Sequence, residues 1–174
     1  MKLLLILLFS ILLVSCGASV AVDYDKEADF THFKSYNFYN DIDSGLNDLD
    51  DKRIMKAIDS TLQTQGFSKS EIPDFLINFY ASETLSNSRN TIGIGLGSGG
   101  GNVGVGVSGG IPIGGKVINQ LLTIDLIDTS KGEELAWQAM IDGEMKEKAT
   151  PQQQQTYYYK VIAQALKKFP PSAK

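Results

Sequence analysis

A glycine-rich segment over residues 93–115 limits the fold of this chain more than any other feature, because twelve of its 23 residues are glycine. Glycine loses more backbone entropy on ordering than any other residue, so this segment is a poor helix former. Branched and aliphatic residues alternate with small or polar ones in two runs, residues 92–96 and 103–107. Such a period of two is typical of β-strands. The pattern predicts a glycine-rich β-hairpin insertion over residues 92–116.

Three interpretations of this insertion remain open. It extends the main sheet with its aliphatic side against the core, or it is a flexible loop, or it is a contact surface. A contact surface would serve a protein partner, self-association or lipid. Its residues would be the aliphatic ones, Ile92, Ile94, Leu96, Val103, Val105 and Val107. A phosphate-binding loop is disfavoured because no Gly-Lys-Ser/Thr follows the glycines.

The N-terminal segment has the composition of a targeting signal. Lys2 precedes twelve residues, 3–14, which are apolar except for Ser10. Twelve helical residues rise about 18 Å, which is too short for a hydrocarbon core of roughly 30 Å. A charged start followed by a short apolar run is typical of a secretory signal peptide. We therefore expect residues 1–15 to be a signal peptide.

The end of this signal, Leu13-Val14-Ser15-Cys16, resembles a bacterial lipobox. The resemblance implies cleavage between Ser15 and Cys16, a diacylglyceryl thioether on Cys16, and acylation of the new amino terminus with a chain such as palmitate. The alternative is a soluble secreted protein in which Cys16, the only cysteine, is incidental. Two or three acyl chains anchor a protein almost permanently, whereas one chain binds only marginally. We expect residues 16–19 to be a short lipidated tether and residues 20–174 to form a single domain.

The composition disfavours several classes of function. With 43% hydrophobic and 21% charged residues, the chain has the balance of an ordinary globular domain. A formal net charge of −4 disfavours nucleic-acid binding, which needs a clustered basic excess. One histidine and one cysteine allow neither an intrachain disulfide nor a zinc site built from these residues. We expect no cofactor and no metal.

No catalytic constellation stands out in the sequence. His32 is the only histidine, and a lone histidine is more often a packing or surface residue than a catalyst. Asp48 and Asp51 are better explained by a helix start than by general acid–base catalysis. We therefore expect that the chain is not an enzyme.

The hydrophobic patterns of the remaining chain predict an α+β fold. Alternation of period two predicts strands at residues 20–24, 35–39, 75–81, 117–128 and 135–142. Helical spacing predicts one helix that is capped by Asp48 and ends at Gly66, and a second that starts with a capping box of Thr150 and Gln153. A mixed, mostly antiparallel sheet with the two helices packed on one face buries these apolar surfaces most simply.

Several short segments together resemble the bacterial lipoproteins grouped as domain-of-unknown-function family 4136, which is common in Bacteroidota. The segments are residues 22–25, 29–36, 73–77, 126–128, 135–137 and 169–171. The resemblance covers nearly all of the chain after Cys16, and it implies a lipid-anchored α+β domain of the cell envelope with no established activity. Gly17 stands where an aspartate would resemble an inner-membrane retention signal. We therefore expect an outer-membrane location facing the periplasm.

These observations lead to one functional expectation and two alternatives. We expect a non-catalytic interaction or accessory module of the cell envelope, attached to the membrane through the lipid on Cys16. It would bind an envelope protein or itself, through a sheet edge or the glycine-rich hairpin, and it would not bind nucleic acid. The first alternative is a lipid or small-molecule carrier that uses a cavity between sheet and helices. A hydrolase is the third and least favoured class.

Overall fold

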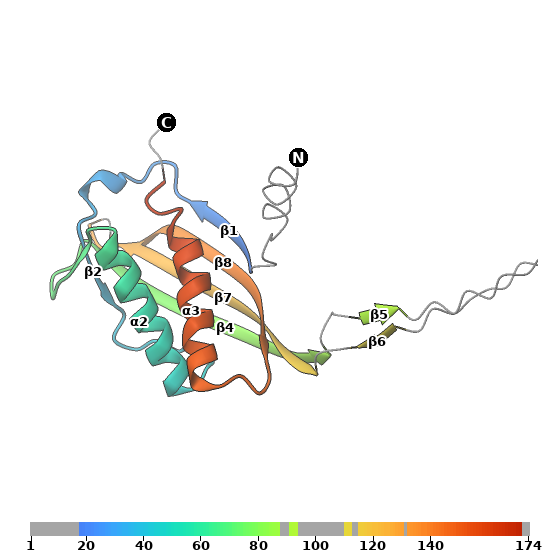
Figure 1. The fold of residues 1–174 in the computed structure, drawn as a ribbon. Coiled ribbons are helices and arrows are strands. Elements are labelled where there is room, and N and C mark those ends of the chain that lie inside the picture. Colours follow the sequence, from blue (N-terminus) through green and yellow to red (C-terminus); the bar gives the residue numbers. More distant parts are fainter. Residues whose placement is uncertain (1–17, 88–90, 94–109, 113–114, 131, 172–174) are drawn as a thin grey trace, which may run out of the picture.

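A computed structural model describes residues 18–87, 91–93, 110–112, 115–130 and 132–171. Its main sheet has six strands in the order β1-β8-β7-β4-β2-β3, and two long helices cover one face of it (Figure 1). The elements in chain order are β1 (Ser19–Tyr24), the 3-10 helix η1 (Phe30–His32), β2 (Ser35–Phe38), α2 (Asp48–Thr64), β3 (Ser68–Lys69), β4 (Phe75–Asn87), β5 (Thr91–Gly93), β6 (Gly110–Pro112), β7 (Lys116–Asp128), β8 (Glu134–Lys146) and α3 (Pro151–Leu166).

The sheet is mixed and mostly antiparallel, which confirms the predicted fold class. The pairs β1–β8, β8–β7 and β7–β4 are antiparallel, whereas β2 runs parallel to both β4 and β3. The central strands alternate between the two faces, so β4 buries Phe75, Ile77 and Phe79 beneath the helices. Neither described helix is long and apolar enough to cross a membrane.

The ends of the helices follow local sequence signals, with one correction. The side chain of Asn47, not that of Asp48, caps α2 by accepting hydrogen bonds from the N–H groups of Leu49 and Asp50. The prediction for Asp48 was one residue late because asparagine and aspartate are equally good caps. Gly66 ends α2 with a positive φ of 94°, as predicted.

The second helix starts as its sequence predicts. The hydroxyl of Thr150 accepts from the N–H of Gln153, and the Gln153 side chain accepts from the N–H of Thr150. Pro151 occupies the first turn, where its missing N–H costs nothing. The inward side of α3 is apolar and includes the fully buried Tyr158 and Ile162, so the helix is held by its core-facing stripe.

A β-bulge changes one face assignment in β8. The alternation predicts Leu135 and Trp137 on the same side of the strand. In the structure Leu135 pairs with Ile127 of β7 and Trp137 pairs with the next residue, Leu126, so one residue of β8 has no partner. The extra residue is Ala136, which is buried, and Leu135 is consequently half exposed. Trp137 remains fully buried in the core.

The glycine-rich insertion is described only at its base, where Thr91–Gly93 pairs antiparallel with Gly110–Pro112. Ile92 belongs to this pair and lies opposite Ile111. Strands β4 and β7 pair along their full length to Asn87 and Lys116, which is longer than the apolar runs predict. Residues 82–87, which are polar except for Leu85, join the strand because β7 supplies a continuous hydrogen-bonding partner, so polarity alone does not end a strand.

Candidate functional site

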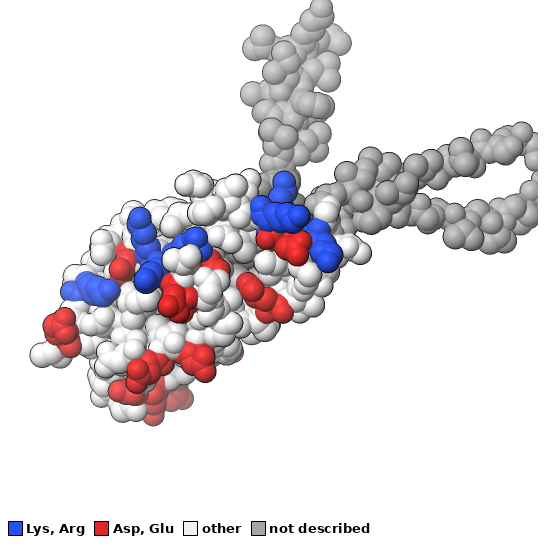
Figure 2. Space-filling model, turned by 90° about the horizontal axis from the view of Figure 1, so that it is seen from below, with Lys and Arg blue, Asp and Glu red and all other residues white. Residues whose placement is uncertain are grey.

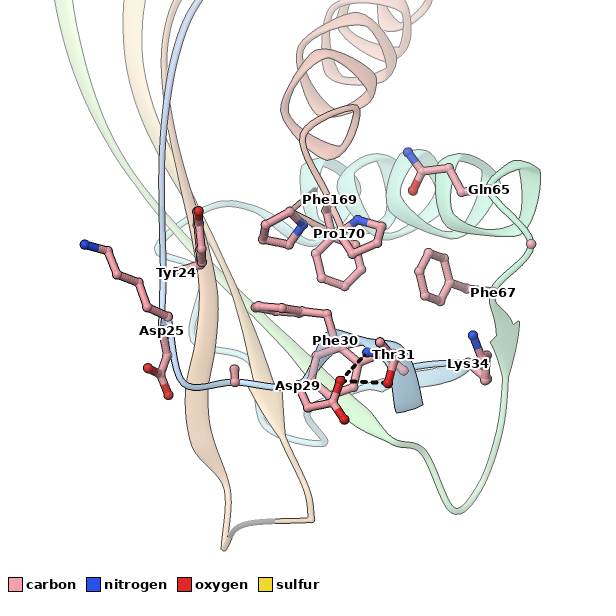
Figure 3. Close-up of a pocket in the computed structure, with 15 residues that line it drawn as sticks. Tyr24, Asp25, Asp29, Phe30, Thr31, Lys34, Gln65, Phe67, Phe169 and Pro170 are labelled. Carbon is pink, nitrogen blue, oxygen red and sulfur yellow. Dashed lines mark hydrogen bonds between the residues drawn. The ribbon is translucent and has the colours of Figure 1, made fainter. Parts of the chain in front are cut away.

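A pocket of about 870 Å³ lies at one end of the sheet in the described structure. Its walls come from the end of β1, the loop with η1, the turn after α2 and the segment after α3 (Figure 3). Five aromatic side chains from these elements line it: Tyr24, Phe30, Phe33, Phe67 and Phe169. We call this site the aromatic pocket. Pockets of this volume with mostly apolar walls are typical of small-molecule sites.

Phe169 joins the rings of the aromatic pocket to the protein core. Its ring centroid lies 5.4 Å from those of Phe67 and Trp137 and 5.5 Å from that of Phe75. Phe169 is almost fully buried, whereas Phe30 and Phe67 are only partly buried and leave ring surface at the opening. The wall is therefore supported from behind by core aromatics, and this support favours a preformed site.

Two carboxylates fix the loop that carries η1. Asp29 caps η1 by accepting from the N–H and hydroxyl of Thr31, at 2.9 and 2.7 Å. Asp74 accepts from the N–H groups of Lys34 and Ser35, at 2.9 and 2.8 Å, and from the Ser35 hydroxyl. Burial acts to raise the pKa of Asp74, but these hydrogen bonds outweigh it and hold the pKa below its usual value.

His32 lies behind the pocket wall and does not line the cavity. Its Nε2 is 3.5 Å from a carboxylate oxygen of the buried Asp128, and its ring packs on Phe33 at 4.5 Å. Asp128 also accepts from the N–H and hydroxyl of Ser130. Burial acts to raise the pKa of Asp128, but Ser130 and the charge of His32 lower it. This arrangement supports the packing interpretation of His32.

The rim of the aromatic pocket is polar. It carries Lys26, Lys34, Asp25 and Asp29, together with Gln65 at the end of α2. Gln65 donates to the backbone oxygen of Leu166 at 2.9 Å, which ties the ends of the two helices together. The ammonium groups of Lys26 and Lys34 make no ion pair within the described part of the chain.

Two side chains reach the backbone of β1, the edge strand on one side of the sheet. At the β1 edge, Gln164 and Lys168 of the C-terminal segment donate to the backbone oxygens of Ala18 and Val20, at 3.0 and 2.9 Å. An added strand would have to displace both side chains. The opposite edge strand, β3, has only two residues.

On the face shown in Figure 2, basic side chains lie mainly along the upper part with some acidic ones among them, and acidic side chains gather at the lower end. Lys116, Lys146 and Lys148 line a smaller hollow near the base of the insertion, and Glu147 lies among them. Within the described residues, no three histidine, cysteine, aspartate or glutamate side chains are placed to hold a metal ion.

The predicted site residues fall mostly outside this region. Ser15, Cys16 and five aliphatic residues of the insertion, Ile94, Leu96, Val103, Val105 and Val107, lie outside the described residues. No motif or periodicity in the sequence predicts the aromatic pocket. A signal was nevertheless there, because three segments that carry the family resemblance, residues 22–25, 29–36 and 169–171, contribute to its walls.

The comparisons with known proteins agree with the observed fold. A family model described as a domain of unknown function, DUF4136, matches residues 20–171 and confirms the resemblance seen in the sequence. No curated protein is significantly similar to the chain.

Two solved structures share the fold at low sequence identity. A PDZ domain protein from Parabacteroides distasonis is 14% identical, with a TM-score of 0.55 over 91% of this chain; the chain spans only 37% of that protein. A PelC dodecamer from Paraburkholderia phytofirmans is also 14% identical, with a TM-score of 0.50 over 86% of this chain and 94% of that one.

Proposed function

The chain belongs to the DUF4136 family, and we propose that it is a non-catalytic binding protein of the bacterial cell envelope that holds an apolar ligand in the aromatic pocket. In this proposal Cys16 carries the lipid anchor and the domain faces the periplasm from the outer membrane. The proposal combines the accessory role with the ligand-carrier alternative, but it places the ligand in a pocket at one end of the sheet and not in a cavity between sheet and helices.

The aromatic pocket is the observation that carries the proposal. Phe30 and Phe67 are partly exposed. Without a ligand, their rings leave apolar surface in contact with water, which is unfavourable. Burial of such surface is worth about 25 cal/mol per Å², so a ligand that covers several rings gains appreciable affinity. Within the described residues, His32 lies beside the carboxylate of Asp128 and packs on the ring of Phe33. No nucleophilic side chain in this part of the chain is hydrogen-bonded to it.

Self-association is the second candidate, and the uncovered face of the sheet favours it. Tyr80, Leu121 and Met140 lie on the face opposite the helices and are 40–45% exposed. The related fold of PelC is described as a dodecamer. Light scattering across a concentration series tests this candidate, with Leu121→Lys as the variant expected to keep the protein monomeric.

Two experiments test the proposal. Thermal melting of the purified protein with a panel of apolar ligands should raise the melting temperature of the wild-type protein and leave that of Phe67→Ser unchanged. No shift with any ligand would refute the binding function. For the anchor, labelled palmitate should be incorporated into the wild-type chain and not into Cys16→Ser, which should also leave the membrane fraction. Equal labelling of both chains would refute the anchor.

A further inference from the structure

We propose that the aromatic pocket binds a free long-chain carboxylate, with the chain against the rings and the carboxylate at the ammonium of Lys34. The inference rests on the proposed binding function and deepens it by naming the class of ligand. It follows from the apolar walls, from the charges of the rim and from the hydrogen bonds and ion pairs that the charged rim residues make.

The walls fit a flexible apolar chain. The ring of Phe30 stands at 83° to that of Phe169. The rings of Phe67 and Phe169 are tilted by 31°, but their centroids are only 5.4 Å apart, so a flat ligand does not fit between them. A planar aromatic ligand would prefer stacked plates, whereas an alkyl chain can pass along ring edges and faces in turn. Pro170 and Pro171 extend the apolar lining beyond the rings.

The rim carries one positive charge close to these rings. Lys34 follows the wall residue Phe33, and in Figure 3 Lys34 and Gln65 lie on either side of Phe67. The backbone N–H of Lys34 is held by Asp74 at 2.9 Å, which fixes the origin of the side chain. The ammonium itself has no ion pair in the described part of the chain, so its charge is free for a ligand.

The acidic residues of the rim are less suited to a ligand. One oxygen of Asp25 accepts from the N–H of Glu27 at 2.9 Å, and one oxygen of Asp29 caps η1. In Figure 3 the carboxylate of Asp25 lies far from Phe67, and that of Asp29 lies beneath Phe30 and is hydrogen-bonded to Thr31. A cationic ligand would meet Lys34 beside the rings, and like charges repel. An anionic head with an apolar body is therefore the complementary ligand.

The test uses quenching of Trp137, the only tryptophan of the chain, by dibrominated stearic acid. The bromines quench on close approach, and Trp137 lies directly behind Phe169, with 5.4 Å between the ring centroids. The protein is the chain from residue 18 onward, which contains every residue of the hydrophobic core that the structure describes. The methyl ester of the same acid is the neutral probe, Lys34→Gln is the test variant, and Lys52→Gln on α2 is the matched control.

We expect saturable quenching by the acid, with about fivefold weaker binding of the ester, a factor typical of one exposed charge pair. Lys34→Gln should lower the affinity for the acid to that for the ester and leave the ester unchanged, and Lys52→Gln should behave as wild type. Equal binding of acid and ester by all three proteins would overturn the carboxylate assignment and leave the proposed function standing. Absence of quenching by both probes would overturn the two together.

Two controls locate and identify the ligand. Phe67→Ser, which opens the wall, should lose quenching by both probes, and quenching that persists in this variant would overturn the assignment to the aromatic pocket. Vesicles of brominated phosphatidylglycerol should leave the emission of Trp137 unchanged. Quenching by these vesicles without quenching by the free acid would show that the site takes a membrane headgroup, and this result would overturn the proposal of a free carboxylate.

Discussion

Trp137 allows a quantitative test of the core, because its ring is fully buried and its indole nitrogen has no hydrogen-bond partner within the described structure. Removing about 200 Å² of buried ring surface at about 25 cal/mol per Å² costs about 5 kcal/mol. The unpartnered N–H offsets about 1–2 kcal/mol of this, because its desolvation penalty disappears with it. We therefore expect Trp137→Ala to lower the free energy of unfolding by about 3–4 kcal/mol, within the usual range for core aromatics.

The comparison with Trp137→Phe isolates the role of the nitrogen. Phenylalanine retains one ring and lacks the N–H, so the lost surface and the relieved desolvation nearly cancel. We expect a free energy of unfolding within about 1 kcal/mol of wild type. Urea denaturation followed by far-ultraviolet circular dichroism measures both variants without using tryptophan emission. If phenylalanine costs as much as alanine, the nitrogen is satisfied in solution and the reasoning about its desolvation is wrong.

Three further predictions concern single contacts of the described structure. Gly143→Ala should cost about 1–3 kcal/mol in urea melts, because a β-carbon there would collide with the Tyr157 hydroxyl, and Tyr157→Phe should recover part of the loss. Thr150→Ala should cost about 1 kcal/mol by removing the capping box of α3, as measured by the same method. Asp74 has a lowered pKa in the folded state, so its stabilisation is present above its usual pKa of 3.8 and disappears as pH falls through the folded value. Acid titration of Asp74→Asn should therefore show a shallower loss of stability than wild type, and identical slopes would contradict this.

The features that depend only on residues close together in the sequence were the most predictable. The capping box of α3 needs only Thr150 and Gln153, and the positive φ at Gly66 needs only a helix that stops there. The strands were recognised because their alternation is local. The face of Leu135 was wrong because a bulge depends on the pairing partner in β7, which alternation within one strand does not contain.

The aromatic pocket was missed for a related reason. Phe30, Phe67 and Phe169 lie in separate connecting segments, and only the ends of two helices and a strand bring them together. No periodicity marks a ring in a loop, so each of these residues looks like an isolated aromatic in the sequence. The family resemblance held the better signal, since its segments at residues 29–36 and 169–171 are distant in sequence and meet at this site.

The path of β1 relates the aromatic pocket to the proposed anchor. The chain enters the sheet at Ser19, the end of β1 nearest to Cys16 in sequence, and reaches the pocket at Tyr24, its other end (Figure 1). Six extended residues span about 17–20 Å. The pocket thus lies at the end of β1 that is farther along the chain from the anchor proposed at Cys16. If that anchor is present, the proposed capture of a free ligand would take place at the far end of this strand.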